Sequence, residues 1–135
     1  MGVNLKLNPI RALVDGKRIV LIDDSIVRGT TCANIIKMLK KAGAKEVHVR
    51  ISSPPFLHPC YFGTDVPSND QLIAHSHTTE QIREMIGADS LGYMQTDYLE
   101  GMAGGLPLCK ACFDGNYPME IPDYTNAEFA DIVKC

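Results

Sequence analysis

The chain has 135 residues, 45% of them hydrophobic, which suits one domain with an apolar core. Its net charge is −3 and its basic residues are scattered along the sequence, which argues against a nucleic-acid-binding protein. No apolar run is long enough to span a bilayer, and the first residues lack the pattern of a signal peptide. We therefore expect a cytoplasmic protein with neither a nucleic acid nor a membrane as partner.

A strand, a helix and a second strand are predicted in the first part of the chain. Residues 1–17 are expected to be irregular, since Pro9 breaks a helix. Residues 18–22 form a β-branched apolar run, which indicates a buried strand. From Thr31 apolar residues recur at helical spacing as far as Gly43, and residues 46–51 then alternate as in a strand. This order predicts a βαβ unit with parallel strands.

The later part of the chain carries weaker signals. Thr78 and Gln81 have the spacing of a capping box, which predicts a helix that ends at Gly87. Three methionines, Met85, Met94 and Met102, are expected in the core. The remaining predicted elements are an ordered loop (54–68), a short helix capped by Ser68 (68–74), a weak strand (90–94), a short helix (96–102) and an irregular end after Gly104.

Two adjacent acids end the first predicted strand and begin a site-like loop. Side chains on consecutive strand residues point to opposite faces, so Asp23 or Asp24 must face the crevice beyond the strand end. Carboxylates in that position suit sugar hydroxyls, a hydrated Mg²⁺, or both. Residues 25–31 add hydroxyls and backbone N–H groups before the helix begins, which suits a phosphate. The pattern predicts a site for a phosphorylated sugar; the alternative is a solvent-exposed turn.

Three cysteines form a second candidate site. Cys109 and Cys112 have a chelating spacing, and Cys60 follows a proline far upstream. Such thiolates suit zinc or an iron–sulfur cluster, and the spacing does not choose between them. The alternative is three reduced, partly buried thiols. Cys32 is expected in the core on the first helix, and nothing supports Cys135 as a ligand.

Residues 20–31 resemble the phosphoribosyl-pyrophosphate (PRPP) signature of type I phosphoribosyltransferases, in the form found in the amidophosphoribosyltransferase family. The resemblance implies an α/β, parallel-sheet type I phosphoribosyltransferase-like fold, present in part over residues 1–103, with the PRPP loop at 20–31. An irregular, cysteine-containing region over residues 104–135 would follow. Further segments that resemble the family are residues 6–9, 50–55, 59–63, 86–91 and 109–113.

The resemblance also implies roles for the two candidate sites. Asp23 and Asp24 would contact the ribose hydroxyls of PRPP and help to hold Mg²⁺. One branch of the family carries a [4Fe–4S] cluster, whose ligands match Cys60, Cys109 and Cys112; its fourth ligand would lie upstream. The residues that would cradle the 5-phosphate are Ser25, Ile26, Val27, Arg28, Gly29, Thr30 and Thr31.

In this family, ammonia from glutamine displaces pyrophosphate from PRPP, giving 5-phosphoribosylamine in the first step of purine biosynthesis. The glutaminase domain of the family begins with a nucleophilic cysteine, and no cysteine here precedes Cys32. We therefore expect the C-terminal part of the enzyme, inactive alone, which receives ammonia from an absent N-terminal domain of a homo-oligomer.

Two other interpretations differ in class. One is a non-catalytic, PRPP-sensing regulator with the same fold; such regulators bind DNA through an added basic domain, which is not visible here. The other is a structural zinc domain, which leaves Asp23, Asp24 and residues 25–31 unexplained.

Overall fold

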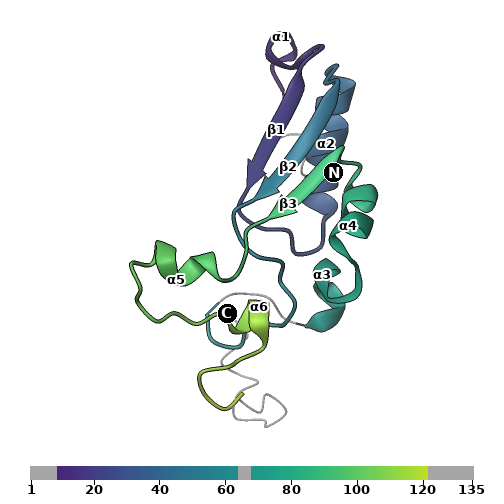
Figure 1. Cartoon of the computed structure of the whole chain (residues 1–135). Coiled ribbons are helices and arrows are strands. Elements are labelled where there is room, and N and C mark those ends of the chain that lie inside the picture. Colours follow the sequence, from purple (N-terminus) through teal and green to yellow (C-terminus); the bar gives the residue numbers. More distant parts are fainter. Residues whose placement is uncertain (1–8, 64–67, 122–135) are drawn as a thin grey trace.

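A computed structural model of the chain describes residues 9–63 and 68–121. Its centre is a parallel sheet in the order β1-β2-β3, with Arg18 opposite Glu46 and His48 opposite Ser90 (Figure 1). The predicted α/β fold and the parallel βαβ unit are confirmed. The strands are β1 (Arg18–Asp23), β2 (Glu46–Ile51) and β3 (Ser90–Tyr93).

Helices α2 and α4 lie on one face of the sheet, α3, α5 and α6 lie toward the carboxyl ends of its strands, and the short α1 lies at the amino end of β1 (Figure 1). Within the described ranges, no helix has the length and apolar character needed to cross a membrane. The helices are α1 (Arg11–Val14), α2 (Thr30–Lys41), α3 (Ile73–Ser76), α4 (Thr79–Ile86), α5 (Tyr98–Met102) and α6 (Ala111–Asp114), with one 3-10 helix, η2 (Asn69–Gln71).

The core lies between the sheet and the helices α2 and α4. Val47 and Val49 of β2 are fully buried there, and Ile36 and Ile82 supply the helix side of the contact. Because side chains alternate along a strand, the residues next to Val47 and Val49 in β2, and their register partners in β1, face the opposite side of the sheet. On that second face Ile22 of β1 is 73% exposed, so the described residues cover the sheet on one side only.

The signals that predicted helix ends are confirmed. Gly43 lies just beyond α2 with a φ of +99°, a backbone conformation that favours glycine. The capping box of α4 is complete, since Thr78 N donates to Gln81 Oε1 at 2.8 Å and Gln81 N donates to Thr78 Oγ1 at 3.3 Å. These local bonds fix where α4 begins.

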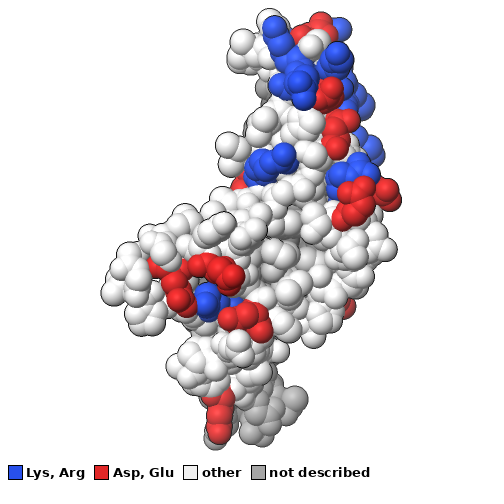
Figure 2. All heavy atoms as spheres, in the orientation of Figure 1, with Lys and Arg blue, Asp and Glu red and all other residues white. Residues whose placement is uncertain are grey.

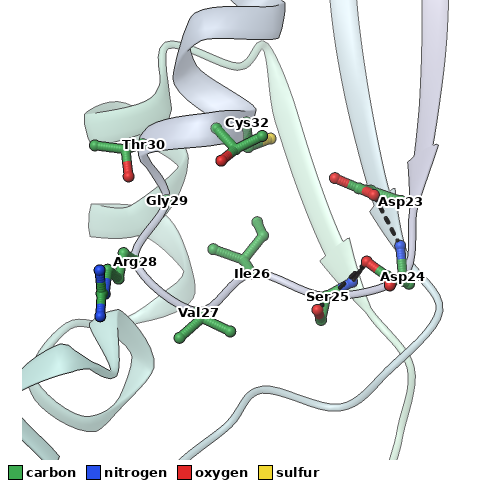
Figure 3. Close-up of a pocket in the computed structure, with 10 residues that line it drawn as sticks. Asp23, Asp24, Ser25, Ile26, Val27, Arg28, Gly29, Thr30 and Cys32 are labelled. Carbon is green, nitrogen blue, oxygen red and sulfur yellow. Dashed lines mark hydrogen bonds between the residues drawn. The ribbon is translucent and has the colours of Figure 1, made fainter. Parts of the chain in front are cut away.

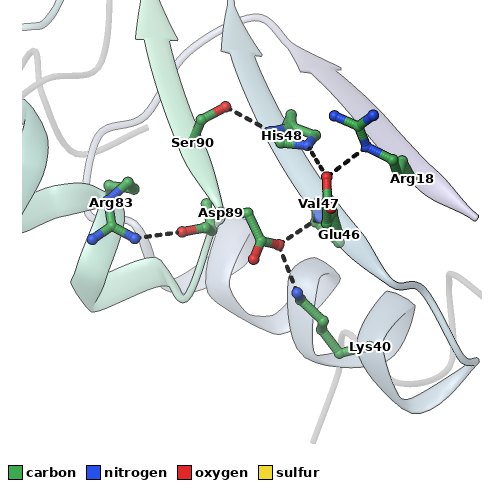
Figure 4. A network of polar contacts seen from close by, with 9 residues as sticks. Arg18, Lys40, Glu46, Val47, His48, Arg83, Asp89 and Ser90 are labelled. Atoms are coloured by element: carbon green, nitrogen blue, oxygen red, sulfur yellow. Dashed lines mark hydrogen bonds and ion pairs between the residues drawn. The ribbon is translucent and has the colours of Figure 1, made fainter.

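Charged side chains connect the elements at the amino ends of the strands (Figure 4). Asp89, at the start of β3, accepts from Lys40 Nζ of α2 and from Val47 N of β2, both at 2.6 Å. The Lys40 ammonium and then the Val47 N–H lower the pKa of the Asp89 carboxyl. Glu46 accepts from Arg18 at 2.6 Å, and its other neighbour, His48, lies at 2.9 Å. The polar bonds thus join all three strands to α2.

The segment after Gly104 packs on the loop that follows β2. Cys112 O accepts from Leu57 N at 2.9 Å and from His58 N at 3.1 Å. The rings of Phe56 and Phe113 lie 5.0 Å apart. These contacts place the cysteine-containing segment beyond the carboxyl ends of the strands, on the side of the molecule that holds α5 and α6 (Figure 1).

Several sequence predictions were wrong in detail. The short helices α1 and α6 occupy stretches expected to be irregular. The helix predicted over 68–74 is divided at the buried Leu72 into η2 and α3, and the Ser68 side chain caps neither. Met85 and Met102 lie on outer helix faces, 56% and 69% exposed, rather than in the core.

The basic residues are less scattered in space than in sequence. Figure 2 shows Lys and Arg gathered at the end of the molecule that holds α1, the start of β1 and the last turn of α2. Arg11, Arg18, Lys40 and Lys41 belong to these elements. Glu46 and Asp89 offset part of this charge through their ion pairs with Arg18 and Lys40.

Candidate functional site

The first candidate site is a cavity of about 480 Å³ at the carboxyl end of β1 (Figure 3). The predicted acids and loop residues all line it, together with the first turn of α2. Open parallel sheets bind their ligands at this edge. The lining residues are Asp23, Asp24, Ser25, Ile26, Val27, Arg28, Gly29, Thr30, Thr31 and Cys32.

The two acids shape the start of the loop with one oxygen each. Asp23 Oδ1 accepts from Asp24 N at 3.0 Å, and Asp24 Oδ1 accepts from Ser25 N at 2.7 Å. The backbone of Asp23 and Asp24 is held by the end of β2, since their carbonyls accept from Ser52 N at 3.0 Å and Ser53 N at 3.1 Å. The second oxygen of each carboxylate has no hydrogen-bond partner among the described residues and is open to a ligand.

The middle of the loop offers backbone rather than side chains. Ile26 is 2% exposed and belongs to the hydrophobic core, so only its main chain can serve a ligand. Gly29 has a φ of +80° and precedes α2, whose first turn presents N–H groups without a helical acceptor. A Cβ on Gly29 would lie 3.1 Å from Ile73 Cδ1 and 3.4 Å from Ile86 Cγ2. The backbone therefore approaches the neighbouring helices closely at this point.

Cys32, in the first turn of α2, also lines the cavity. It is 3% exposed, as expected for a core residue. Burial raises the pKa of its thiol to about 11, and the nearby Asp23 carboxylate adds to the shift. The thiol is therefore protonated at neutral pH and is a poor nucleophile.

The loop also contacts a segment that no sequence pattern had predicted to lie beside it. Val27 O accepts from Ile73 N at 2.9 Å, and the Arg28 guanidinium donates to Gln71 Oε1. In Figure 3 Arg28 extends away from Asp23 and Asp24. Gln71 lies 43 residues from Arg28 in the sequence, so no local pattern could have revealed this contact.

The three candidate cysteine ligands line a second cavity, of about 260 Å³. Burial, and then the charges of Cys60 and Cys109, raise the pKa of Cys112 to about 11. The Tyr61 and Tyr117 rings lie beside them, 5.3 Å apart. In residues 9–63 and 68–121 no three His, Cys, Asp or Glu side chains are close enough together to hold one metal ion. Cys135 lies outside the described residues.

The chain was compared with known proteins. No family model matches it. Amidophosphoribosyltransferase of Pyrococcus horikoshii is 55% identical over 116 residues, and that of Bacillus subtilis is 50% identical over 129 residues. These matches cover 86% and 89% of this chain, but only 26% of each relative.

A solved structure of a relative has a similar fold. The B. subtilis glutamine PRPP amidotransferase, complexed with ADP and GMP, superposes with a TM-score of 0.79 at 46% identity. The superposition covers 91% of this chain and 28% of the solved one, so the chain spans about a quarter of the length of these relatives. This chain is homologous to one segment of the amidophosphoribosyltransferases, the part with their phosphoribosyltransferase fold.

Proposed function

We propose that this chain is the PRPP-binding part of an amidophosphoribosyltransferase of de novo purine biosynthesis. The complete enzyme would make 5-phosphoribosylamine from PRPP and glutamine. The observation that carries the proposal is the cavity at the end of β1, where two acids and a phosphate-type loop line one space. The identity to enzymes of that name, 50% with the B. subtilis relative, supports PRPP as the ligand.

Different site residues would contact different parts of the ligand. Asp23 and Asp24 would accept hydrogen bonds from the ribose hydroxyls through their unoccupied oxygens. The N–H groups from Ser25 to Thr31 and the start of α2 would hold the 5-phosphate, helped by the helix dipole. The ribose would thus be fixed at both ends while ammonia replaces the pyrophosphate at C1.

A divalent cation fits the acidic end of this site. Each aspartate retains one carboxylate oxygen, the kind of ligand that Mg²⁺ prefers, and phosphate oxygens or water would complete its coordination. Bound there, Mg²⁺ would neutralise negative charge that develops on the leaving pyrophosphate.

The thiol cavity fits an iron–sulfur cluster in the chemistry of its donors. Cys60, Cys109 and Cys112 all line it, although they do not converge on a single ion position. In the intact enzyme of the cluster-containing branch they would supply three thiolates to a [4Fe–4S] cluster. A fourth ligand would come from outside the described residues.

The organisation of the protein follows from the same proposal. Residues 1–103 would form part of the phosphoribosyltransferase domain, and residues 104–135 a separate cysteine-containing region. Ammonia would come from a glutaminase domain, within a cytoplasmic homo-oligomer. Reading the gene upstream of Met1 tests this, because the lack of an in-frame, Cys-initiated glutaminase domain would contradict it.

A binding measurement tests the site itself. Asp24→Asn keeps the shape of the side chain and the Oδ1 acceptor for Ser25 N, but removes the charge. We expect PRPP to bind about tenfold more weakly or worse with Mg²⁺ present, since a hydrogen bond to a charged group contributes about 1.5–3 kcal/mol. Isothermal titration calorimetry measures this, with Asp97→Asn outside the cavity as the control. Unchanged affinity in the Asp24 variant would contradict the assigned role.

A further inference from the structure

The phosphate loop rests on a part of the chain outside the recognised motif. We call residues 69–76, which contain η2 and α3, the support segment. It contacts the loop in three ways: Ile73 N donates to Val27 O at 2.9 Å, Ile73 Cδ1 packs under Gly29, and Gln71 Oε1 accepts from Arg28. One side-chain bond, one backbone bond and one packing contact therefore meet within three consecutive loop residues.

The support segment is itself firmly placed. Leu72 is 1% exposed and Ile73 is 9% exposed, so both anchor it in the interior. At its far end the His75 ring lies 2.8 Å from Leu57 O, in the loop after β2. These contacts fix the position of Gln71, so its amide oxygen lies at a defined position beside the Arg28 guanidinium.

We propose that Gln71 is a positioning residue for the phosphate loop. Its amide oxygen accepts from the Arg28 guanidinium, and Arg28 extends away from Asp23 and Asp24 (Figure 3). This bond fixes the turn from Val27 to Gly29 before a ligand arrives, so its N–H groups already face the cavity. Pre-ordering a loop lowers the entropy lost on binding. The proposal rests on the proposed function only for the identity of the ligand, a ribose phosphate.

The first test measures affinity for PRPP with Mg²⁺ by calorimetry. Gln71→Ala removes the acceptor, and PRPP should bind about two- to tenfold more weakly, the range for a typical hydrogen bond, since this bond to the charged guanidinium is exposed to solvent. Gln71→Glu keeps an acceptor for Arg28 and should restore the affinity. Asp70→Ala, in the preceding position of the same 3-10 helix, is the matched control and should bind like the wild type. A Gln71→Ala variant with wild-type affinity would overturn the proposal.

A double-mutant cycle separates positioning from general support. If Gln71 acts through Arg28, Gln71→Ala should cost nothing further in an Arg28→Ala background. An undiminished loss in that background would show that Gln71 acts through another contact and would refute its role on Arg28.

A second readout needs no ligand. Hydrogen exchange of the Ile73 amide, which donates to Val27 O, should become about two- to tenfold faster in the free chain of Gln71→Ala, and should stay unchanged in Gln71→Glu and Asp70→Ala. Unchanged exchange in Gln71→Ala would refute the proposal even if the wild-type chain bound no PRPP. That lack of PRPP binding would contradict the proposed function instead.

Discussion

Gly29→Ala is the substitution that most directly tests how the phosphate loop is built. Gly29 combines a φ of +80° with a close approach to two isoleucines. Gly87 has a similar φ, +75°, but nothing lies within 4 Å of where its Cβ would be. The same change at the two positions therefore separates the backbone cost from the packing cost.

The expected magnitudes follow from the two environments. A left-handed backbone costs an L-residue about 1–2 kcal/mol, of which about 0.4–1 kcal/mol is offset by the lower entropy of the unfolded chain. Gly87→Ala should therefore destabilise the fold by about 1 kcal/mol. At Gly29 the new Cβ also meets Ile73 Cδ1 at 3.1 Å, and overpacking of this kind costs about 1 kcal/mol or more. Gly29→Ala should lose about 2–3 kcal/mol.

Urea unfolding at 25 °C measures these free energies, with the slopes compared to detect any change in the unfolded state. A third variant makes the test specific, because Ile73→Val removes the one atom, Cδ1, that the new methyl group meets most closely. Alone it should cost about 0.5–1.5 kcal/mol. Combined with Gly29→Ala it should cost about 1 kcal/mol less than the sum of the two changes.

Two results would refute this reasoning. Equal losses for Gly29→Ala and Gly87→Ala would show that the packing contact contributes nothing. Strict additivity of Gly29→Ala and Ile73→Val would place the strain elsewhere.

Two further predictions concern titratable groups. The pKa of Asp89 is lowered, so its contribution to stability is present above the unfolded-state value of 3.8 and is lost as the pH falls through the lower folded value. Asp89→Asn should cost about 1 kcal/mol in urea unfolding at pH 7, a modest value because the side chain is 37% exposed, and little at pH 2; an equal loss at both would contradict the role of its charge. In the native chain at pH 8, iodoacetamide should modify the exposed Cys109 but not Cys32, whose thiol is buried with a pKa of about 11. Mass spectrometry measures the labelling of each cysteine, and modification of Cys32 at the rate of Cys109 would contradict this prediction.

Local patterns predicted the elements well because their causes are local. The apolar run before Asp23, the alternation of residues 46–51 and the capping box at Thr78 each contain the interactions that form the element. The acids and loop of the first site could be found for the same reason, since they are consecutive in the chain. Ile26 shows the limit of that approach: it belongs to the motif, but its side chain is part of the core.

The features that the sequence did not reveal depend on contacts between distant residues. Gln71 and Ile73 support the loop across more than 40 residues of chain, and no periodicity marks them. Met85 was expected in the core because methionine is apolar, but the helix turns it outward, 56% exposed. The short helix α6 forms where the chain packs against the loop after β2. That contact joins distant residues, so the local sequence around α6 predicted an irregular segment instead.

The parallel sheet also implies an order of assembly during folding. Pairing Arg18 with Glu46 closes a separation of 28 residues, whereas pairing His48 with Ser90 closes one of 42. The shorter closure loses less entropy and uses residues that leave the ribosome earlier, so β1, α2 and β2 should associate first. Asp23 and Asp24 are in place at that stage. The turn after them gains its support only when the second crossover, with Gln71 and Ile73, has docked, so the phosphate cradle is completed late in folding.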